Sequence, residues 1–522
     1  MLKNKIKRGL LFFCAALILL GCNGAGSNDI LDNDNDTLPA ITIDIGDRKQ
    51  MIRNFGASDA WVCQYVGRWP DETRKKVATW LFSKDVNQND KPLGIGLSLW
   101  RFNVGAGSAS QTNIQDPWRR TEGFLQADGS YDWTRQEGQQ WFLRAAKEHG
   151  VEKLLAFTNS PPVSLTKNGK AFSSSGTEAN ISPENYKKFG TFLVDMLEHF
   201  QANGLPIDYL SPFNEPQWDW TGDGQEGSPY TNQEIFSVTK ILDSLLNKSS
   251  VTTKLQIAEA GKLNYLYEKA DKNTRGDQIF EFFSPASPVY LGNLSRLDKI
   301  ISGHSYFTSN PIETLQDVRS KVADKVHESE SGIEFWQSEY CLLGDHEEIA
   351  PNGKDLGINP ALYIARIIHH DLTYANASAW HWWLAVSVYD YKDGLIYADK
   401  NTTNGNVEDS KMLWALGNFS RFIRPDAQRV GVTADEINIG NARQLMFSSY
   451  VNTNGEVVAV AINYSNADTE IMLGVKDREV ANVKSYRTSA AVDENLKPVP
   501  VDDLSKVALP KRSVTTFVMS LK

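Results

Sequence analysis

The chain has 522 residues, of which 41% are hydrophobic and 23% are charged, and its formal net charge is -10. This is the composition of a globular protein that is long enough for a large core and more than one domain. The acidic balance and the lack of a long basic run exclude nucleic acid as the main partner. Aromatic residues make up 11% of the chain and include 14 Trp. Some of these Trp lie in polar segments, which suits a partner with flat apolar faces and many hydroxyls, such as a sugar.

The first 22 residues predict a targeting segment. Four basic residues by position 8 precede an apolar run over Leu10–Leu20, which is too short to span a membrane as a mature helix. The run ends in Leu19-Leu20-Gly21-Cys22, which resembles a bacterial lipoprotein cleavage box. We therefore predict a signal peptide over residues 1–21, a lipid on Cys22 and a flexible tether over residues 22–38. The protein would be held by this lipid alone in the bacterial cell envelope, in the outer membrane facing the exterior.

Two Cys, Cys63 and Cys341, follow the predicted lipid site. In an exported chain they could form a disulfide, and the sequence leaves both states open. No cluster of His and Cys has the spacing of metal ligands, so we predict no metal and no cofactor. We expect a monomer.

Strand-like and helix-like segments alternate between residues 51 and 425. The predicted strands are 52–60, 97–105, 153–159, 207–213, 254–259, 299–306, 333–339 and 378–385. The predicted helices are 71–83, 136–149, 183–202, 232–247, 311–328, 361–375 and 411–422. This alternation requires parallel strands with helical crossovers, and eight strands indicate an α/β protein with a closed (β/α)8 TIM barrel. An open doubly wound sheet is the alternative, and it is disfavoured because no Gly-rich nucleotide loop follows any strand.

The pattern changes after Pro425. The following segments are short, alternate in polarity and are divided by Asn, Gly, Asp or Pro, which is typical of a β-sandwich. They are 427–439, 443–450, 456–464, 469–475, 481–486 and 512–520. We therefore predict a β-sandwich domain over residues 426–522. The early strand 41–45 precedes the barrel, so residues 39–50 are expected to join this sandwich.

Two Glu residues at predicted strand ends carry the functional hypothesis. Glu215, in SPFNEPQWDW, ends strand four at Pro216, which cannot donate to a sheet, and Glu339 ends strand seven. In such a barrel both side chains face the same mouth. Glycoside hydrolysis uses two carboxyl groups, about 5–5.5 Å apart when configuration is retained and about 6.5–9.5 Å apart when it is inverted. Nearby indoles would raise the pKa of Glu215 toward that of a proton donor. Either residue alone could also be an ordinary strand-end carboxylate.

Several short motifs resemble glycoside hydrolase family 30, a family of the clan A retaining glycosidases. They are Phe55-Gly56-Ala57-Ser58, Trp100-Arg101-Phe102-Asn103, Asn159-Ser160-Pro161-Pro162, Ser338-Glu339, Trp414-Ala415-Leu416-Gly417 and Phe422-Ile423-Arg424-Pro425. The resemblance covers nearly the whole predicted mature chain and implies a barrel with a side β-sandwich built from both termini. It also implies that Glu215 is the acid/base and Glu339 the nucleophile.

Motif position and chemistry together indicate further substrate-binding candidates. Asn214 is placed to hydrogen-bond the sugar 2-hydroxyl. Arg101 could keep Glu339 ionised through a charge-assisted bond, or could form a salt bridge at the barrel rim. Trp382 resembles the aromatic floor under the reactive sugar, whereas Trp383 could be only a core residue. The remaining candidates are Asn159 on strand three, His304 and Tyr306 on strand six, and Asp59 and Trp61 after strand one; His304 could instead be a buried, satisfied histidine.

Loop residues bear on the substrate. Val163-Ser164 stands where many family members carry an aromatic residue, which argues against transferring a xylan or glucosylceramide specificity. The loop over 217–227 and the segments 105–108 and 118–120 resemble the endo-β-1,6-galactanase branch, in which Trp218, Trp220 and Trp118 would be stacking surfaces. We therefore expect retaining cleavage of internal β-1,6-galactosidic linkages in (arabino)galactan side chains. A β-1,6-glucanase or xylanase, a catalytically inactive glycan-binding lipoprotein and a structural adhesin are the alternatives.

Overall fold

The computed structural model describes residues 38–329, 332–343 and 348–522. The predicted signal peptide, the predicted lipid site at Cys22 and all of the predicted tether except Leu38 lie outside these ranges. Among the described residues, none of the helices is both long enough and apolar enough to cross a membrane.

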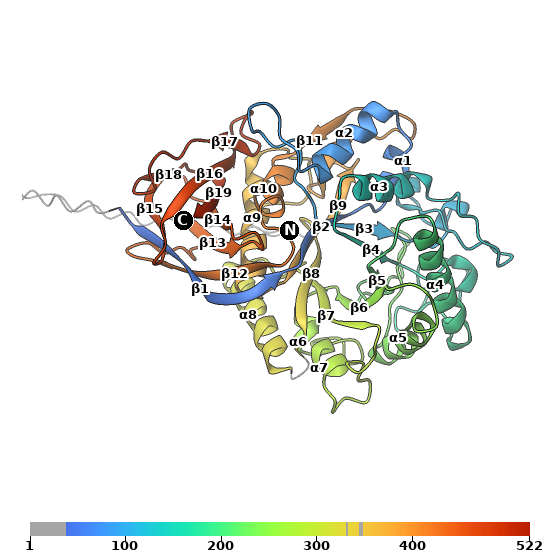
Figure 1. The fold of residues 1–522 in the computed structure, drawn as a ribbon. Coiled ribbons are helices and arrows are strands. Elements are labelled where there is room, and N and C mark those ends of the chain that lie inside the picture. Colours follow the sequence, from blue (N-terminus) through green and yellow to red (C-terminus); the bar gives the residue numbers. More distant parts are fainter. Residues whose placement is uncertain (1–37, 330–331, 344–347) are drawn as a thin grey trace, which may run out of the picture. The chain divides into compact units, whose positions relative to one another are not determined.

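Eight parallel strands form a closed barrel. Neighbours pair in sequence order, and the last strand pairs with both the first and the one before it. The strands are β2 (Asn54–Ser58), β3 (Leu99–Asn103), β4 (Lys153–Phe157), β5 (Tyr209–Ser211), β6 (Lys254–Ala260), β7 (Leu297–His304), β8 (Glu334–Tyr340) and β9 (Ala379–Ser387). Figure 1 shows them following one another around the ring. The prediction of a TIM barrel is confirmed. Two further strands, β10 (Gly394–Ala398) and β11 (Val407–Asp409), extend the sheet beside β9.

Helices connect the barrel strands as the alternating pattern predicts. The longer ones are α2 (Asp71–Phe82), α3 (Glu137–Glu148), α4 (Tyr186–Ala202), α5 (Asn232–Leu246), α8 (Ile312–Glu328), α9 (Ile358–Thr373) and α10 (Lys411–Ser420). The shorter ones are α1 (Cys63–Val66), α6 (Asn264–Tyr267) and α7 (Gln278–Phe283), with 3-10 turns at Ser108–Ser110, Pro117–Arg119, Val163–Leu165 and Pro183–Asn185. α5 illustrates how sequence fixes a helix start, because Thr231 and Glu234 form a reciprocal capping box there.

The strand that precedes the candidate acid is shorter than the sequence indicates. We predict 207–213, whereas β5 ends at Ser211. Pro212 follows directly and has no backbone N–H to donate to a neighbouring strand, so regular pairing stops there. Glu215 therefore lies in the loop after the strand rather than at its last position.

The second sheet is the β-sandwich. It has nine strands in the order β17-β16-β19-β14-β13-β12-β1-β15-β18. They are β1 (Ala40–Ile52), β12 (Ala427–Ala434), β13 (Leu445–Val451), β14 (Val457–Asn463), β15 (Thr469–Val475), β16 (Val480–Ser489), β17 (Lys497–Val499), β18 (Val507–Leu509) and β19 (Ser513–Leu521). The N-terminal strand β1, blue in Figure 1, pairs antiparallel with β12 and parallel with β15. It leads into barrel strand β2 after one residue.

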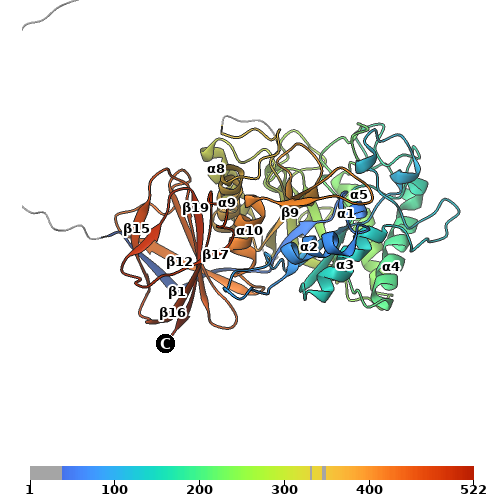
Figure 2. The ribbon, with the colours of Figure 1, turned by 90° about the horizontal axis from the view of Figure 1, so that it is seen from above.

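α9 and α10 contact both sheets, as Figure 2 shows from above. Asn418 of α10 is fully buried and donates to the backbone carbonyl of Tyr486 at 3.2 Å and to the Thr516 hydroxyl at 2.9 Å. The Thr516 hydroxyl in turn donates to the Asn418 carbonyl at 2.7 Å. The side-chain amide nitrogen of Asn418 thus has two acceptors where the helix meets the sandwich, and these bonds tie α10 to that sheet.

Candidate active site

A cavity of about 640 Å³ lies at the carboxyl ends of the barrel strands. It is lined by Trp61, Arg119, Asn214, Glu215, Trp218, Trp220, Gln225, Tyr306, Phe307, Glu339, Cys341, Leu343, Trp383, Tyr389, Asp390, Tyr391 and Asp393. Both predicted catalytic residues are among them. Active sites of TIM barrels are built at this end, because loops after several strands converge there.

Glu215 is held in the loop after β5 by backbone contacts. Its φ of 43° lies in the left-handed region, which is uncommon for a residue other than Gly. Its N–H donates to the carbonyl of Glu259 at 2.9 Å, and its carbonyl accepts from the Trp220 indole at 3.0 Å and from the Trp218 N–H at 3.1 Å. These bonds offset the strain and aim a nearly buried carboxyl group into the cavity.

Glu339 lies one residue before the end of β8 and is held by two side chains. Arg101 of β3 donates from Nη1 to Oε2 at 2.5 Å, and the Tyr306 hydroxyl donates to Oε1 at 3.1 Å. Arg101 is completely buried, so its charge is poorly screened by water. Both contacts fix the orientation of the carboxylate, which is what a nucleophile requires.

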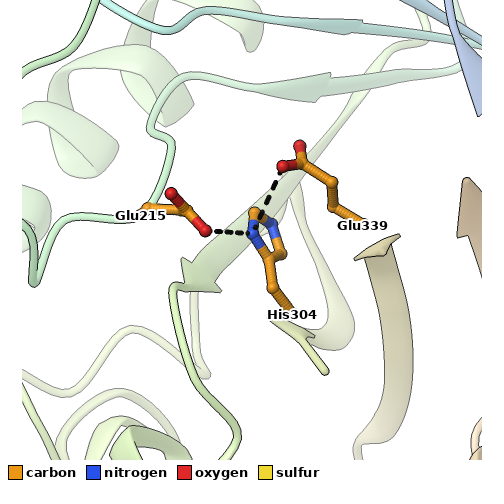
Figure 3. A group of neighbouring side chains, drawn as sticks. All are labelled: Glu215, His304 and Glu339. Atoms are coloured by element: carbon orange, nitrogen blue, oxygen red, sulfur yellow. Dashed lines mark hydrogen bonds and ion pairs between the residues drawn. The ribbon is translucent and has the colours of Figure 1, made fainter. Parts of the chain in front are cut away.

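His304, the last residue of β7, lies between the two carboxyl groups (Figure 3). Its Nδ1 is 2.9 Å from Oε1 of Glu215 and 3.7 Å from Oε1 of Glu339. One carboxylate oxygen of each Glu and a ring nitrogen of His304 all lie within 4.8 Å of one another. A separation this short matches the spacing of retaining glycosidases, at about 5–5.5 Å, rather than that of inverting ones.

A third carboxylate, Glu259 of β6, was not among the sequence candidates. It is fully buried behind His304 and accepts from His304 Nε2 at 2.8 Å, from the Ser338 hydroxyl at 2.6 Å and from the Ser211 hydroxyl at 2.9 Å. Arg101 Nη2 also approaches it at 3.4 Å. The sequence could have indicated Glu259, because it ends predicted strand 254–259 just as Glu215 and Glu339 end predicted strands four and seven.

These contacts set the protonation states. Burial disfavours a charged His304, but Glu339, Glu215 and Glu259 outweigh it and raise the pKa of the imidazole to about 10. Burial also opposes the ionisation of Glu259, yet Arg101 and His304 lower the pKa of that carboxyl to about 2. Burial raises the pKa of Glu215 above its ordinary value, although His304 acts in the opposite direction. At neutral pH a charged His304 therefore bridges an ionised Glu259 and a carboxyl group suited to donate a proton.

Several substrate-binding candidates do line the cavity. Asn214, Trp218, Trp220 and Tyr306 all contribute to its wall. The side-chain oxygen of Asn214 has no hydrogen-bond partner among the described residues, so it is available to a ligand. Trp61, which the sequence also indicated, lines the wall as well.

Other candidates are not part of the wall. Arg101 is buried beneath the cavity and acts on Glu339 rather than on a ligand. Asp59 is buried and accepts from the Asn103 N–H at 2.7 Å and from Gln139 at 3.1 Å, and burial raises its pKa to about 8. Asn159 is buried outside the lining residues. Trp118 is also absent from the lining: it packs on Tyr65, with 4.3 Å between ring centroids, and its stacking role stays a prediction.

Trp383, and not Trp382, which the sequence indicates as the aromatic floor, is among the residues that line the cavity. Trp382 is completely buried and donates from its indole to the carbonyl of Asp393 at 2.8 Å. The register of β2 and β9 shifts here, with Ala57 opposite Trp382 and Ser58 opposite Leu384. Trp383 is thus an extra residue in β9, and such a bulge changes which side chain faces the cavity.

The sequence did not identify several other lining residues. Phe307 follows Tyr306, and the segment between β9 and β10 adds Tyr389 to Tyr391 and Asp393. Burial raises the pKa of the Asp393 carboxyl to about 6. Cys341 also lines the cavity, and it and Cys63 are separate free thiols, which settles the disulfide that the sequence left open.

Glu215, His304 and Glu339 also have the atoms that could ligate a metal ion. Among residues 38–329, 332–343 and 348–522 they are the one group of three or more such side chains whose ligand atoms are this close. Hydrogen bonding through His304 already accounts for their approach, and the sequence predicts neither a metal nor a cofactor.

A closed barrel that brings one oxygen of each of two carboxyl groups to within 4.8 Å in one cavity has the arrangement that glycoside hydrolases use. Residues 39–397 match the model of O-glycosyl hydrolase family 30, and residues 426–517 match the β-sandwich domain of the same family. The chain belongs to glycoside hydrolase family 30.

Solved structures have the same fold. A conserved exported protein from Bacteroides fragilis is 36% identical, with a TM-score of 0.86, and the match covers 92% of this chain and 100% of that one. The catalytic domain of xylanase C from Talaromyces cellulolyticus, of family 30, is 21% identical with a TM-score of 0.67, over 92% of this chain and 100% of that one.

One relative is named for the cleavage of a β-1,6-galactoside. An exo-β-1,6-galactobiohydrolase of Bifidobacterium longum subsp. longum is 23% identical over 193 residues. That match spans 30% of this chain and only 13% of the length of the relative.

Proposed function

We propose that this protein is a retaining glycoside hydrolase that cleaves internal β-1,6-galactosidic linkages of (arabino)galactan side chains by double displacement. The observation that carries the mechanism is the approach of Glu215 and Glu339 to within 4.8 Å in one cavity, with different hydrogen-bond partners on each. Arg101 and Tyr306 hold Glu339 through hydrogen bonds, and burial favours the protonated form of Glu215. The two carboxyl groups are thereby suited to different roles.

In the first step the Glu339 carboxylate attacks the anomeric carbon while Glu215 protonates the glycosidic oxygen. The bond between that carbon and oxygen breaks, and the aglycone sugar leaves with the proton. In the second step Glu215, now ionised, takes a proton from water, whose oxygen attacks the anomeric carbon and releases Glu339. Arg101 and Tyr306 hold Glu339 throughout, and Asn214 can hydrogen-bond the sugar 2-hydroxyl.

The galactan specificity rests on two independent supports. The loop that carries Trp218 and Trp220 resembles the endo-β-1,6-galactanase branch, and both residues line the cavity. The matched Bifidobacterium relative is named for a β-1,6-galactoside. Cleavage within the chain, rather than from its end, is part of this proposal and follows from the loop resemblance. The alternative family activities are β-1,6-glucanase and xylanase, and matched structures are named for each of them.

A product profile tests the substrate. The enzyme is incubated with β-1,6-galactan, β-1,6-glucan and xylan, and the released oligosaccharides are separated by size. We expect a ladder of galacto-oligosaccharides from the galactan and little product from the others. Glucose- or xylose-based ladders would replace the galactan proposal with one of the alternatives, and release of a single short product would replace endo cleavage with exo cleavage.

The Glu339→Gln variant separates an enzyme from a glycan-binding protein. Gln has nearly the same shape but cannot form the covalent intermediate, so turnover should vanish while oligosaccharide binding, measured by calorimetry, persists. A variant that hydrolyses as fast as the wild type would show that Glu339 is not the nucleophile. A wild type that binds but never hydrolyses would favour the inactive glycan-binding lipoprotein.

We also propose that Cys22 carries the lipid that anchors the enzyme to the outer membrane, facing the exterior. The basic and apolar segments before it and the Leu-Leu-Gly-Cys ending support this proposal. Cells expressing the protein should incorporate labelled fatty acid into it, and Cys22→Ser should abolish the label. Proteinase added to intact cells should degrade the anchored protein; its full protection would contradict an outward orientation.

A further inference from the structure

Phe307 combines an exposed side chain with an unusual backbone conformation, so burial in the core does not account for it. Its side chain is 51% exposed and lines the cavity. Its φ is 57°, in the left-handed region, where a bulky residue is a genuine outlier. Strain of this kind persists where the surrounding structure enforces it, and it clusters at ligand sites. An exposed apolar ring held at the mouth of the cavity therefore points to a binding role.

Phe307 does not stand alone. The Trp218 ring lies edge-on to it, with centroids 6.0 Å apart and an interplanar angle of 86°. The ammonium of Lys262 is 5.2 Å from the Trp218 ring and 5.6 Å from the Phe307 ring, which are cation–π distances. Gly261 is required beneath the indole, since a Cβ there would lie 2.5 Å from Trp218 Nε1. We call Phe307, Trp218 and Lys262 the aromatic platform.

The platform lies beside the candidate acid. Trp218 is three residues after Glu215, and its N–H donates to the Glu215 carbonyl at 3.1 Å. A general acid protonates the oxygen of the leaving group, so the leaving sugar must lie on the Glu215 side of the cleaved bond. Trp61 and Trp383 form a second aromatic pair, with centroids 5.4 Å apart, on residues that follow or belong to β2 and β9. Of these two aromatic pairs, Phe307 and Trp218 form the pair that is joined to the acid through a hydrogen bond.

We propose that the aromatic platform is the binding site for the leaving sugar, a neutral pyranose whose apolar face packs on Phe307 and Trp218. The Lys262 ammonium fixes the two rings and can donate to the sugar hydroxyls. This inference rests on the proposed function, because it takes Glu215 as the proton donor. In a retaining enzyme the same site receives the acceptor when a sugar hydroxyl replaces water in the second step.

Two substrates distinguish binding of the leaving sugar by the platform from a general structural role of Phe307. Each substrate donates its glycosyl group to Glu339. One is the tetrasaccharide of the polymer that the wild type cleaves in the product profile. The other is the disaccharide of the same polymer with fluoride β-linked at its anomeric carbon. Both form the same bond from Glu339 to the anomeric carbon. From the fluoride, the carbon–fluorine bond breaks and fluoride leaves, so no sugar occupies the platform. For Phe307→Ala we expect the ratio of kcat/KM for the tetrasaccharide to kcat/KM for the fluoride to fall about tenfold, the effect of losing an aromatic anchor.

Phe280→Ala is the matched control. Phe280 is also a partly exposed Phe, at 38%, but it belongs to α7 and lines a different cavity. This variant should leave the ratio unchanged. Adding a free acceptor sugar to the fluoride reaction gives a second readout: the wild type should form a transfer product at saturating acceptor, and Phe307→Ala should need a much higher acceptor concentration.

The outcomes separate the two claims. A wild type active on both donors, with an unchanged ratio in Phe307→Ala, overturns the platform and leaves the hydrolase intact. An equal loss on both donors assigns Phe307 a structural role and also overturns the platform. A wild type inactive on the tetrasaccharides of all three polymers overturns the proposed function and, with it, the platform.

Discussion

Glu259 and His304 form a fully buried pair, with 2.8 Å between Oε2 and Nε2, behind the two candidate catalytic residues. His304 uses its other ring nitrogen to contact Glu215 at 2.9 Å. Glu259 helps to keep His304 protonated. Although Glu259 does not line the cavity, it therefore contributes to the positive charge beside Glu215. Glu259 and His304 therefore position Glu215, the candidate proton donor.

The first prediction concerns the pH dependence of activity. A charged His304 stabilises the ionised form of Glu215 and so lowers the pKa of its carboxyl, against the larger effect of burial. Replacing it with neutral Asn should let the pKa of Glu215 rise further. The alkaline limb of kcat/KM against pH, which reports the acid in the free enzyme, should then move to higher pH in His304→Asn. The exposed His327 at the end of α8 provides the control: His327→Asn should leave the limb in place. A shift to lower pH in His304→Asn would contradict this electrostatic role.

The second prediction concerns folding stability. The pKa of His304 is about 10 in the folded protein and 6.5 in an ordinary environment. A raised pKa gives stability that is fully present below pH 6.5 and is lost as the pH rises through about 10. The Tm of the wild type should therefore fall more between pH 6.5 and 10 than the Tm of His304→Asn. Equal slopes in the two proteins would indicate that His304 does not hold an extra proton in the folded state.

The third prediction concerns the buried cation. Arg101 contacts both Glu339 and Glu259, so Arg101→Met leaves two buried carboxylates without their guanidinium. Breaking a buried ion pair in this way costs about 3–5 kcal/mol of unfolding free energy. Lys497→Ala breaks an exposed pair with Asp493 and should cost less than about 1 kcal/mol. Chemical denaturation measures both. Similar losses in the two variants would contradict the assignment of Arg101 to a poorly screened site.

The fourth prediction compares the two adjacent Trp residues of β9. Trp383 lines the cavity, so Trp383→Ala should lower kcat/KM by about tenfold or more with a smaller change in Tm. Trp382 is completely buried, and Trp382→Ala should instead destabilise the fold by about 3–5 kcal/mol. Steady-state kinetics and thermal unfolding of both variants distinguish them. The reverse pattern would restore Trp382 as the floor of the site.

The sequence predicted the barrel because hydrophobic alternation and helical periodicity do not depend on distant contacts. Glu215 and Glu339 could be found for the same reason, since each follows an apolar run. The structure places Glu215 four residues beyond the end of β5, because Pro212 interrupts the strand. Local signals thus located the element and the residue, but not the exact end of the strand.

Residues whose roles depend on register or on loop conformation were not predictable. Trp383 faces the cavity because of a bulge that sequence alternation does not reveal. Phe307 has a left-handed backbone conformation that favours Gly, and the residues next to it in the sequence do not predict this conformation. Glu259 ended a predicted strand, but its function depends on a buried His from the next strand and an Arg from β3.

The stereochemistry of the first product tests the central claim most directly. Proton NMR, recorded during the first minutes of hydrolysis of β-1,6-galactan, distinguishes the two anomers of the new reducing end before they interconvert. Two carboxyl groups within 4.8 Å predict that the β anomer forms first and the α anomer follows only by mutarotation. Initial formation of the α anomer would mean direct attack by water, and Glu339 could not then be the nucleophile.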